Sequence, residues 1–246
     1  MNVSSILIMC ALPQEKEALT SELKGDATDV VISETFGLKA LKYQYGEHQI
    51  FVKETGMGNV NAGIGLAMIL EKIDMDQVIL IGVGGALRSD LKIGDMIISD
   101  AVLQHDYLSS LDFGDCRMQP GALILNPEDN AAHDPIIQST PLKIKLDLSE
   151  NSDILRGLVL SGSEFVGTTK RKNELAKLHK DAMLVDMEAS AIGYVANKAG
   201  IPFIIAKTVS DRLLPDGSIE SDFTLFLEEA SKNAAMVTLK LLESLD

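Results

Sequence analysis

Gln77-Val78-Ile79-Leu80-Ile81-Gly82-Val83 is the stretch that decides the fold. It is apolar almost throughout and shows no alternation with polar residues, which is typical of a parallel strand buried on both faces. The glycines of Gly82-Val83-Gly84-Gly85 indicate a turn at its end. Ile6–Ala11, a second apolar run, is ended by Pro13 and has the same character. Both runs are therefore predicted to lie at the centre of a parallel sheet.

Working outward from these two runs, the sequence alternates between strand and helix patterns. Further strands are predicted at residues 30–32, 38–45, 49–52, 95–103, 158–162, 183–186 and 202–206, and helices at 15–23, 59–73, 170–179, 188–199 and 223–241. Residues 106–154 are polar, without a strong period, and are predicted as loops. The pattern predicts one α/β domain over residues 1–246, a three-layer α/β/α sandwich with a mixed, mainly parallel central sheet.

Composition narrows the classes of function. The chain has 246 residues, of which 22 are basic and 36 acidic, giving a net charge of −14. Such a charge repels phosphate backbones and anionic lipids, so we expect neither a nucleic acid nor a membrane as a partner. Two distant cysteines give no disulfide framework and no zinc motif. The first apolar run is short and has no Lys or Arg before it, which predicts a buried strand and a cytoplasmic protein.

Several acidic or glycine-rich segments follow predicted strands, where open α/β sheets place their ligands. The pair Gly56 and Gly58 precedes a helix, but Asn61 stands where a dinucleotide fingerprint needs its third glycine. A tight turn is therefore the better interpretation, and no Walker A sequence is present. Of the four histidines, none has metal-ligand spacing, and only His105 is retained as a candidate for a pocket wall.

Three carboxylates stand out by position, although each has an ordinary structural alternative. Glu188 lies in an almost wholly apolar segment between a strand and a helix, where it could bind ligand hydroxyls or simply complement the helix N-terminus. Asp211 follows a buried strand and could be a turn residue. Glu15 could be a first-turn helix acid.

Taken together and in order, these segments resemble the nucleoside phosphorylase/hydrolase superfamily, and within it the 5′-methylthioadenosine/S-adenosylhomocysteine nucleosidases. The resemblance spans most of the chain, and the joint occurrence of short motifs makes it specific. The matching segments are residues 11–15, 55–62, 82–87, 93–100, 161–166, 185–189 and 208–211, which include Ala11-Leu12-Pro13-Gln14-Glu15, Val185-Asp186-Met187-Glu188-Ala189 and Thr208-Val209-Ser210-Asp211.

The resemblance implies cleavage of an N-glycosidic bond through a transition state with ribosyl-cation character. Asp211, held by Ser210, would protonate adenine N7. An aspartate with the ordinary pKa of ~3.9 seldom holds a proton at neutral pH, so this role requires partial burial or sharing of the proton with the base. Glu15 would orient and deprotonate the attacking water. Glu188, with the Met187 backbone, would bind the ribose hydroxyls.

The resemblance also assigns the groups that recognise the rest of the substrate. Phe165 would stack on the purine, and the Val166 backbone would read the adenine edge. Leu12, Met57 and Phe223 would line the apolar pocket for the 5′ substituent, with ordinary core packing as the alternative for all three. No metal or organic cofactor is implied.

The sequence also departs from the family pattern. Val83 replaces a hydroxyl residue that phosphorylases use to hold phosphate, which favours water as the nucleophile. Lys207 stands where bacterial nucleosidases often have Arg, which puts ribose contacts there in doubt. Glu164 and the longer loop 212–221 could alter the 5′ pocket.

Several alternatives therefore stay open. They are a phosphorolytic nucleoside phosphorylase, a hydrolase of another nucleoside such as futalosine, and a nucleoside-binding protein without activity. The resemblance also implies a homodimer, with residues 104–120 as a candidate contributor to the neighbouring pocket. A small-molecule nucleoside is the expected substrate.

Overall fold

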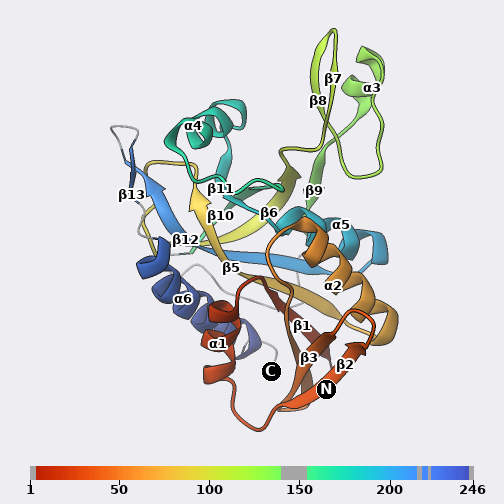
Figure 1. Cartoon of the computed structure of the whole chain (residues 1–246), viewed down its shortest axis with the longest axis vertical. Helices are drawn as coiled ribbons and strands as arrows, with labels where there is room; N and C mark the ends of the chain where they lie inside the picture. Colours follow the sequence, from red (N-terminus) through yellow and green to blue (C-terminus); the bar gives the residue numbers. More distant parts are fainter. Residues whose placement is uncertain (1–3, 140–153, 215–217, 221–222, 244–246) are drawn as a thin grey trace.

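A mixed β-sheet forms the centre of the structure, a computed structural model that describes residues 4–139, 154–214, 218–220 and 223–243 (Figure 1). Its strands are β1 (Ser5–Cys10), β2 (Thr28–Ser33), β3 (Leu38–Tyr45), β4 (His48–Glu54), β5 (Gln77–Ala86), β6 (Met96–Gln104), β9 (Ile136–Gln138), β10 (Ile154–Ser161), β11 (Ala182–Asp186), β12 (Phe203–Leu213) and β13 (Ile219–Glu220). The helices are α1 (Pro13–Glu22), α2 (Asn59–Lys72), α3 (Pro127–Ala132), α4 (Thr169–Leu178), α5 (Ala189–Ala199) and α6 (Phe223–Glu243).

The sheet follows the order β13-β12-β6-β10-β11-β5-β1-β4-β3-β2, and β9 pairs with β6. The central pairs β4–β1, β1–β5, β5–β12, β6–β10 and β10–β11 are parallel. Antiparallel pairs occupy the edges and join β11 to β5 and β12 to β6. Because β12 also pairs with β5, the strands β5, β12, β6, β10 and β11 form a closed circuit. The predicted α/β class with a mixed, mainly parallel central sheet is confirmed.

Helices cover both faces of the sheet, and strand β1 shows why. Ile6 and Ile8 pack with Leu19 of α1 and with α6, whereas Leu7 and Met9 pack with α2 and α5. Alternate side chains of a strand point to opposite faces, so an uninterrupted apolar strand needs helices on both sides. Each of these four strand side chains is fully buried, which contributes roughly 1.5–3 kcal/mol apiece. The helices α1 and α6 lie together on one face, and α2 and α5 on the other (Figure 1).

The turn predicted at Gly82–Gly85 is wrong, because β5 continues through these glycines to Ala86. Strand β12 pairs alongside them, from Lys207 opposite Gly82 to Asp211 opposite Gly85. Glycine is needed there because neighbouring side chains occupy the space: a Cβ on Gly84 would lie 2.2 Å from Leu184 Cδ2. The glycines that indicated a turn therefore allow close approach inside a strand.

Strand β12 also runs further than predicted, so Asp211 lies within a strand and not beyond its end. The pairing with β5 shifts register between Val209 and Asp211, which leaves Ser210 as the extra residue of a bulge. Bulges of this kind re-aim side chains near functional sites. Lys207, Thr208 and Ser210 interrupt the apolar pattern of β12 although all three are buried. Hydrophobicity alone therefore did not show that the strand continues to Leu213.

The prediction of loops over residues 106–154 is also partly wrong. Strands β7 (Leu108–Leu111) and β8 (Gly114–Arg117) form a hairpin, and α3 and β9 follow it. The hairpin and α3 project from the body of the sheet (Figure 1). These elements are too short and too polar for a periodic signal, and residues 140–153 of the predicted loop lie outside the described ranges. None of the helices in those ranges is both long and apolar enough to cross a bilayer.

Candidate active site

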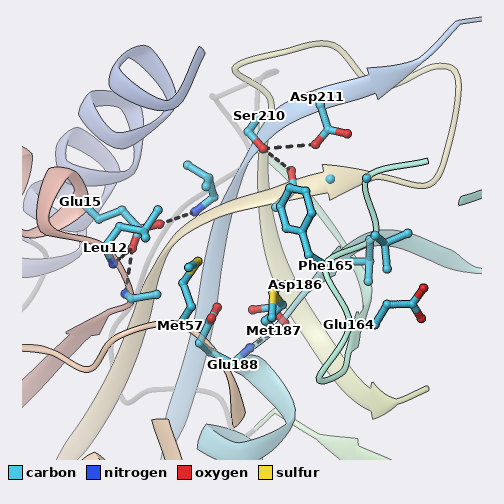
Figure 2. Close-up of a pocket in the computed structure, with 17 residues that line it drawn as sticks. Leu12, Glu15, Met57, Glu164, Phe165, Asp186, Met187, Glu188, Ser210 and Asp211 are labelled. Carbon is cyan, nitrogen blue, oxygen red and sulfur yellow. Dashed lines mark hydrogen bonds between the residues drawn. The ribbon is translucent and has the colours of Figure 1, made fainter. Parts of the chain in front are cut away.

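A cavity of about 320 Å³ opens where α1, β5, β11 and β12 meet the segments that precede α2, α4 and α5 (Figure 2). Nine of the ten predicted site residues line it: Leu12, Glu15, Met57, Phe165, Val166, Met187, Glu188, Ser210 and Asp211. The tenth, Phe223, begins α6, and its side chain lies outside the described part of the chain. The other lining residues are Ala11, Val83, Gly84, Gly85, Glu164, Gly167, Val185 and Asp186.

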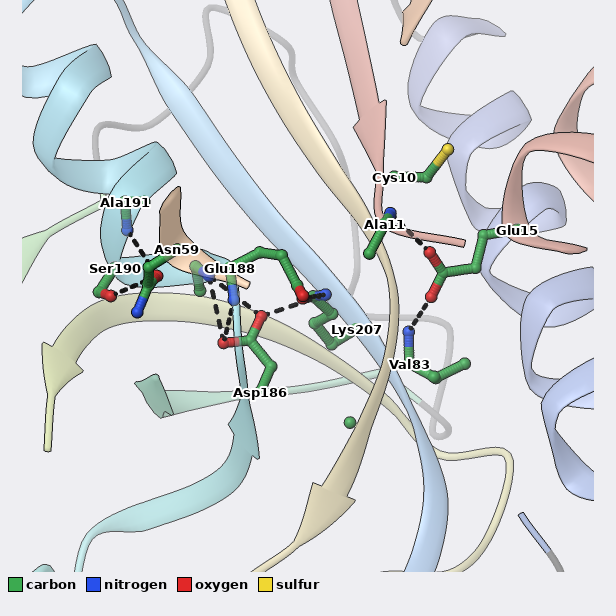
Figure 3. Close-up of polar contacts among 12 residues, drawn as sticks. Cys10, Ala11, Glu15, Asn59, Val83, Asp186, Glu188, Ser190, Ala191 and Lys207 are labelled. Carbon is green, nitrogen blue, oxygen red and sulfur yellow. Dashed lines mark hydrogen bonds and ion pairs between the residues drawn. The ribbon is translucent and has the colours of Figure 1, made fainter. Parts of the chain in front are cut away.

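Glu15 is held rigidly by backbone N–H groups. Its Oε2 accepts hydrogen bonds from Ala11 N at 2.8 Å and Leu12 N at 2.9 Å. Its Oε1 accepts one from Val83 N at 3.0 Å, and Figure 3 shows the bonds from Ala11 and Val83. The absence of a side chain at Gly82 makes room, since a Cβ there would lie 2.4 Å from Oε1. The first turn of α1 and the glycine run of β5 thus fix this carboxylate in one orientation.

Burial governs the acid–base character of Glu15, which is only 1% exposed. Desolvation raises its pKa above the ordinary value, and the nearby negative charge of Glu188 acts in the same direction, although Lys207 and the backbone N–H groups oppose it. A carboxylate with a raised pKa is a stronger base than a solvated one. Glu15 is therefore suited to accept a proton from a bound water.

Glu188 lies at the N-terminus of α5 and is anchored on two sides. Its Oε1 accepts a hydrogen bond from Gly58 N at 2.9 Å, and its Oε2 lies 3.2 Å from Lys207 Nζ. The adjacent Asp186 accepts hydrogen bonds from the N–H groups of Glu188 and Ala189, and it pairs with Lys207 at 3.1 Å (Figure 3). Asp186 thus accepts hydrogen bonds from the backbone N–H groups at the start of α5 and shares the cation that fixes Glu188.

Lys207 is wholly buried behind this group of carboxylates and does not line the cavity. Burial alone would lower its pKa, but the charges of Asp186, Glu188 and Glu15 together raise it above the ordinary lysine value. It therefore stays positively charged. Lys207 stands where bacterial nucleosidases often have Arg, and in this structure its side chain does not reach the cavity. It supplies instead the cation that positions Glu188.

Asp211 points toward the opposite end of the cavity from Glu15 (Figure 2). Its Oδ1 accepts a hydrogen bond from Ser210 Oγ at 3.3 Å, and Ser210 Oγ also lies 3.2 Å from Gly84 O. Its Oδ2 forms an ion pair with the Nζ of Lys172 from α4. Burial lowers the pKa of Lys172, and the charge of Asp211 opposes that shift. This lysine was not singled out in the sequence.

The remaining wall of the cavity is apolar and partly open. Phe165, with 65% of its surface exposed, and Met57, with 56%, lie at the rim, and Val166 is buried beside them. Glu164 lines the same rim, where both its oxygens accept hydrogen bonds from Arg171 Nε at 3.0 and 2.9 Å. A planar, uncharged group could therefore lie against the Phe165 ring without meeting a free charge from Glu164.

The prediction of His105 as a candidate pocket wall is wrong, because this residue is buried outside the cavity lining. It packs beneath Gly162, where a Cβ would lie 2.3 Å from its Nε2. Across the ranges that the structure describes, no three His, Cys, Asp or Glu side chains are grouped so that they could hold a metal ion.

The model of the phosphorylase superfamily matches residues 5–243. A 5′-methylthioadenosine/S-adenosylhomocysteine nucleosidase of Staphylococcus aureus (strain JH9) is 29% identical over 202 residues, which cover 81% of this chain and 83% of the relative. The chain therefore belongs to the phosphorylase superfamily.

Solved structures show the same fold. A Borrelia burgdorferi B31 protein, provisionally assigned as a nucleosidase of the same name and solved with adenine bound, superposes with a TM-score of 0.79 at 29% identity, covering 97% of this chain and 99% of that one. Futalosine hydrolase of Helicobacter pylori superposes with a TM-score of 0.79 at 23% identity, covering 98% of each chain. At that identity the second likeness concerns the fold alone.

Proposed function

We propose that this chain is a hydrolase that cleaves the N-glycosidic bond of 5′-modified adenosines, such as 5′-methylthioadenosine and S-adenosylhomocysteine, and releases adenine. One observation carries the proposal: Glu15, Glu188 and Asp211, from three distant parts of the sequence, line a single cavity. The S. aureus relative and the adenine bound to the B. burgdorferi protein support the same substrate class.

Each group has a role that its surroundings suit. Glu15 takes a proton from the attacking water, because it is buried, fixed and basic. Glu188, with the Met187 backbone, accepts hydrogen bonds from the ribose hydroxyls and stabilises positive charge that develops on the sugar. Asp211, oriented by Ser210, delivers a proton to adenine N7 so that the base leaves neutral.

The other lining residues bind the two ends of the substrate. Phe165 stacks on the purine and the Val166 backbone reads its edge. Leu12 and Met57 contact the 5′-alkylthio group, for which an apolar wall is favourable. Phe223 is assigned to the same wall from the sequence alone.

Water is the nucleophile in this proposal, and the charge of the cavity supports it over phosphate. The described lining holds five acidic residues, Glu15, Glu164, Asp186, Glu188 and Asp211, and no Lys or Arg. The cations behind the wall, Arg171, Lys172 and Lys207, are already paired with lining carboxylates and do not line the cavity. A phosphate dianion would therefore find no cation to bind it there, and the side chain of Val83 offers it no hydrogen bond.

The test is adenine release from 5′-methylthioadenosine, measured in phosphate-free buffer and again with phosphate, with the sugar product identified by chromatography. The proposal expects free methylthioribose at the same rate in both buffers. A sugar phosphate formed only with phosphate would make the protein a phosphorylase. Faster turnover of futalosine side by side would reassign the substrate, and saturable binding without release would indicate a binding protein.

We further propose that the protein is a homodimer and acts in methionine salvage. A cytoplasmic location is proposed because Cys10 and Cys116 are free, as is usual for cysteines in a reducing compartment. Exposed apolar side chains support the dimer: Met57 at the cavity rim and the neighbouring Val60 and Ile64 of α2 are 56%, 72% and 42% exposed. Residues 104–120 are the candidate contributor from the second subunit. Light scattering should give twice the chain's 26.6 kDa, and a monomeric mass would contradict the dimer.

A further inference from the structure

Lys172 forms an ion pair with Asp211, but the proposed function gives Lys172 no role. Lys172 is 0% exposed, and its ammonium contacts Asp211 Oδ2 and lies 3.3 Å from the carbonyl oxygen of Ala86. A Cβ on Gly85 would lie 2.6 Å from Nζ and 2.9 Å from Asp211 Oδ1. A glycine at this position of β5 therefore leaves the space in which the two side chains meet.

This contact raises a chemical question about the leaving group. A carboxylate in contact with an ammonium is stabilised in its ionised form, yet a group that protonates adenine N7 must carry a proton. The ionisable group in contact with Asp211 is the ammonium of Lys172. The acid needed for departure of the base is therefore a property of two residues and not of one.

We propose that Lys172 is a positioning residue that stores the proton which Asp211 delivers to the purine; this inference rests on the proposed hydrolase function and deepens it. Moving a proton from the ammonium to the carboxylate replaces two buried charges by two neutral groups, and loss of water favours that exchange. Asp211 has 13% of its side chain exposed. A purine bound over it would remove this remaining water and drive the proton to Asp211.

The proton balance closes over one turnover. Lys172 gives a proton to Asp211, and Asp211 gives it to N7 as the C1′–N9 bond breaks and its electron pair enters the purine. Water forms the new bond to C1′ and loses a proton to Glu15. Adenine and the free sugar leave, with Glu15 protonated and Lys172 neutral. Exchange with solvent then returns one proton from the carboxyl group and supplies one to the amine.

The test compares the pH dependence of kcat in wild-type protein with that in Lys172→Gln, Lys172→Arg and Asp211→Asn variants. Lys172→Gln should lower kcat about 10- to 100-fold near neutral pH with little change in KM, and should move the alkaline limb of kcat to lower pH. Lys172→Arg keeps the charge but does not release its proton, so it should be as slow as Lys172→Gln. Lys170→Gln is the matched control, because this neighbouring side chain is 89% exposed.

Two further measurements guard against a folding defect. Adding Lys172→Gln to Asp211→Asn should cost nothing more, because the two residues act as a unit. In the wild-type protein, the alkaline limb should move to lower pH on warming, as amine ionisation does and carboxyl ionisation does not.

The outcomes separate the two proposals. An unchanged pH profile in Lys172→Gln, wild-type rates in Lys172→Arg, or a temperature-independent alkaline limb would each overturn the role of Lys172 and leave the hydrolase standing. Wild-type protein that releases no adenine from any of the nucleosides would overturn the proposed function and this inference with it.

Discussion

Lys207, which lies behind the cavity wall, forms a buried ion pair with the lining residue Glu188, with Nζ 3.2 Å from Oε2. The same ammonium lies 3.1 Å from Asp186 Oδ2, so one cation compensates two carboxylates. Burial of these charges is tolerated only because they are paired. The carboxylate assigned to the ribose is thus held in place from the side that faces away from the substrate.

Replacing Lys207 by Met should therefore destabilise the protein by about 3–5 kcal/mol, because two buried carboxylates lose their partner. Urea denaturation followed by circular dichroism measures this change in the free energy of unfolding. Lys232→Met, which breaks an exposed pair with Glu228, is the control and should cost less than about 1 kcal/mol. Equal effects of the two substitutions would show that the buried pair is dispensable.

Replacing Glu15 by Gln should lower kcat by about 10²- to 10⁴-fold, the usual contribution of a general base. The amide is nearly isosteric but cannot accept a proton from water, and its NH₂ group would oppose a backbone N–H. Glu17→Gln, on the exposed side of the same helix, should leave the rate unchanged. Steady-state adenine release measures both, and comparable rates would remove Glu15 from the mechanism.

The pH dependence of kcat/KM in the wild-type protein should reveal the ionisation of Glu15. Burial raises the pKa of Glu15 above its ordinary value of 4.5, and a base is active only when ionised. Activity should thus be lost as the pH falls through this raised pKa, earlier than a solvated glutamate would allow. The profile of kcat/KM against pH measures the acid limb, and a limb at or below the ordinary value would contradict the assignment.

Replacing Phe165 by Ala should raise KM about 3- to 10-fold with little change in kcat, since stacking on an aromatic ring contributes about 0.5–1.5 kcal/mol. Phe36 is a matched control, because it is 62% exposed against 65% for Phe165 and does not line the cavity. A loss confined to kcat would place Phe165 in the chemical step instead of in purine binding.

Replacing Gly82 by Ala should reduce activity by at least about 10²-fold, because the new Cβ would lie 2.4 Å from Glu15 Oε1 and the backbone φ is +141°. Gly46→Ala controls for backbone strain, since Gly46 has a φ of +56° with nothing within 4 Å of the added Cβ. Kinetic constants and melting curves of both variants separate displacement of Glu15 from loss of fold. Full activity of Gly82→Ala would contradict the fixed geometry of Glu15.

The sequence predicted the buried strands and the cavity residues better than the groups that support them. Apolar runs such as Ile6–Ala11 determine burial locally, and short motifs marked Glu15, Glu188 and Asp211. The buried ion pair of Lys207 could have been predicted, because a single lysine inside the apolar stretch of β12 implies a buried, paired charge. Lys172 carried none, because its helix contains several lysines and only the fold distinguishes it from the exposed Lys170.

Pairing between strands that are distant in the sequence could not be predicted from local patterns. Gly82–Gly85 indicated a turn by composition, but their conformation depends on Lys207–Asp211, more than a hundred residues later in the chain. The β7–β8 hairpin is stabilised by pairing between very short strands and by packing of Cys116 with Met118 and Ile124. Such contacts leave little periodicity for a single sequence to reveal.

The closed circuit of β5, β12, β6, β10 and β11 fixes the orientation of the charges in the site. Every strand in the circuit is hydrogen-bonded on both sides, so Asp211 on β12 and the glycines of β5 cannot move apart without breaking several ladders at once. Dipoles and charges carried by such a framework are already oriented before a substrate arrives. In water, solvent dipoles would have to reorient around a developing ribosyl cation, which costs free energy. In this site the corresponding reorganisation takes place when the protein folds, before catalysis begins.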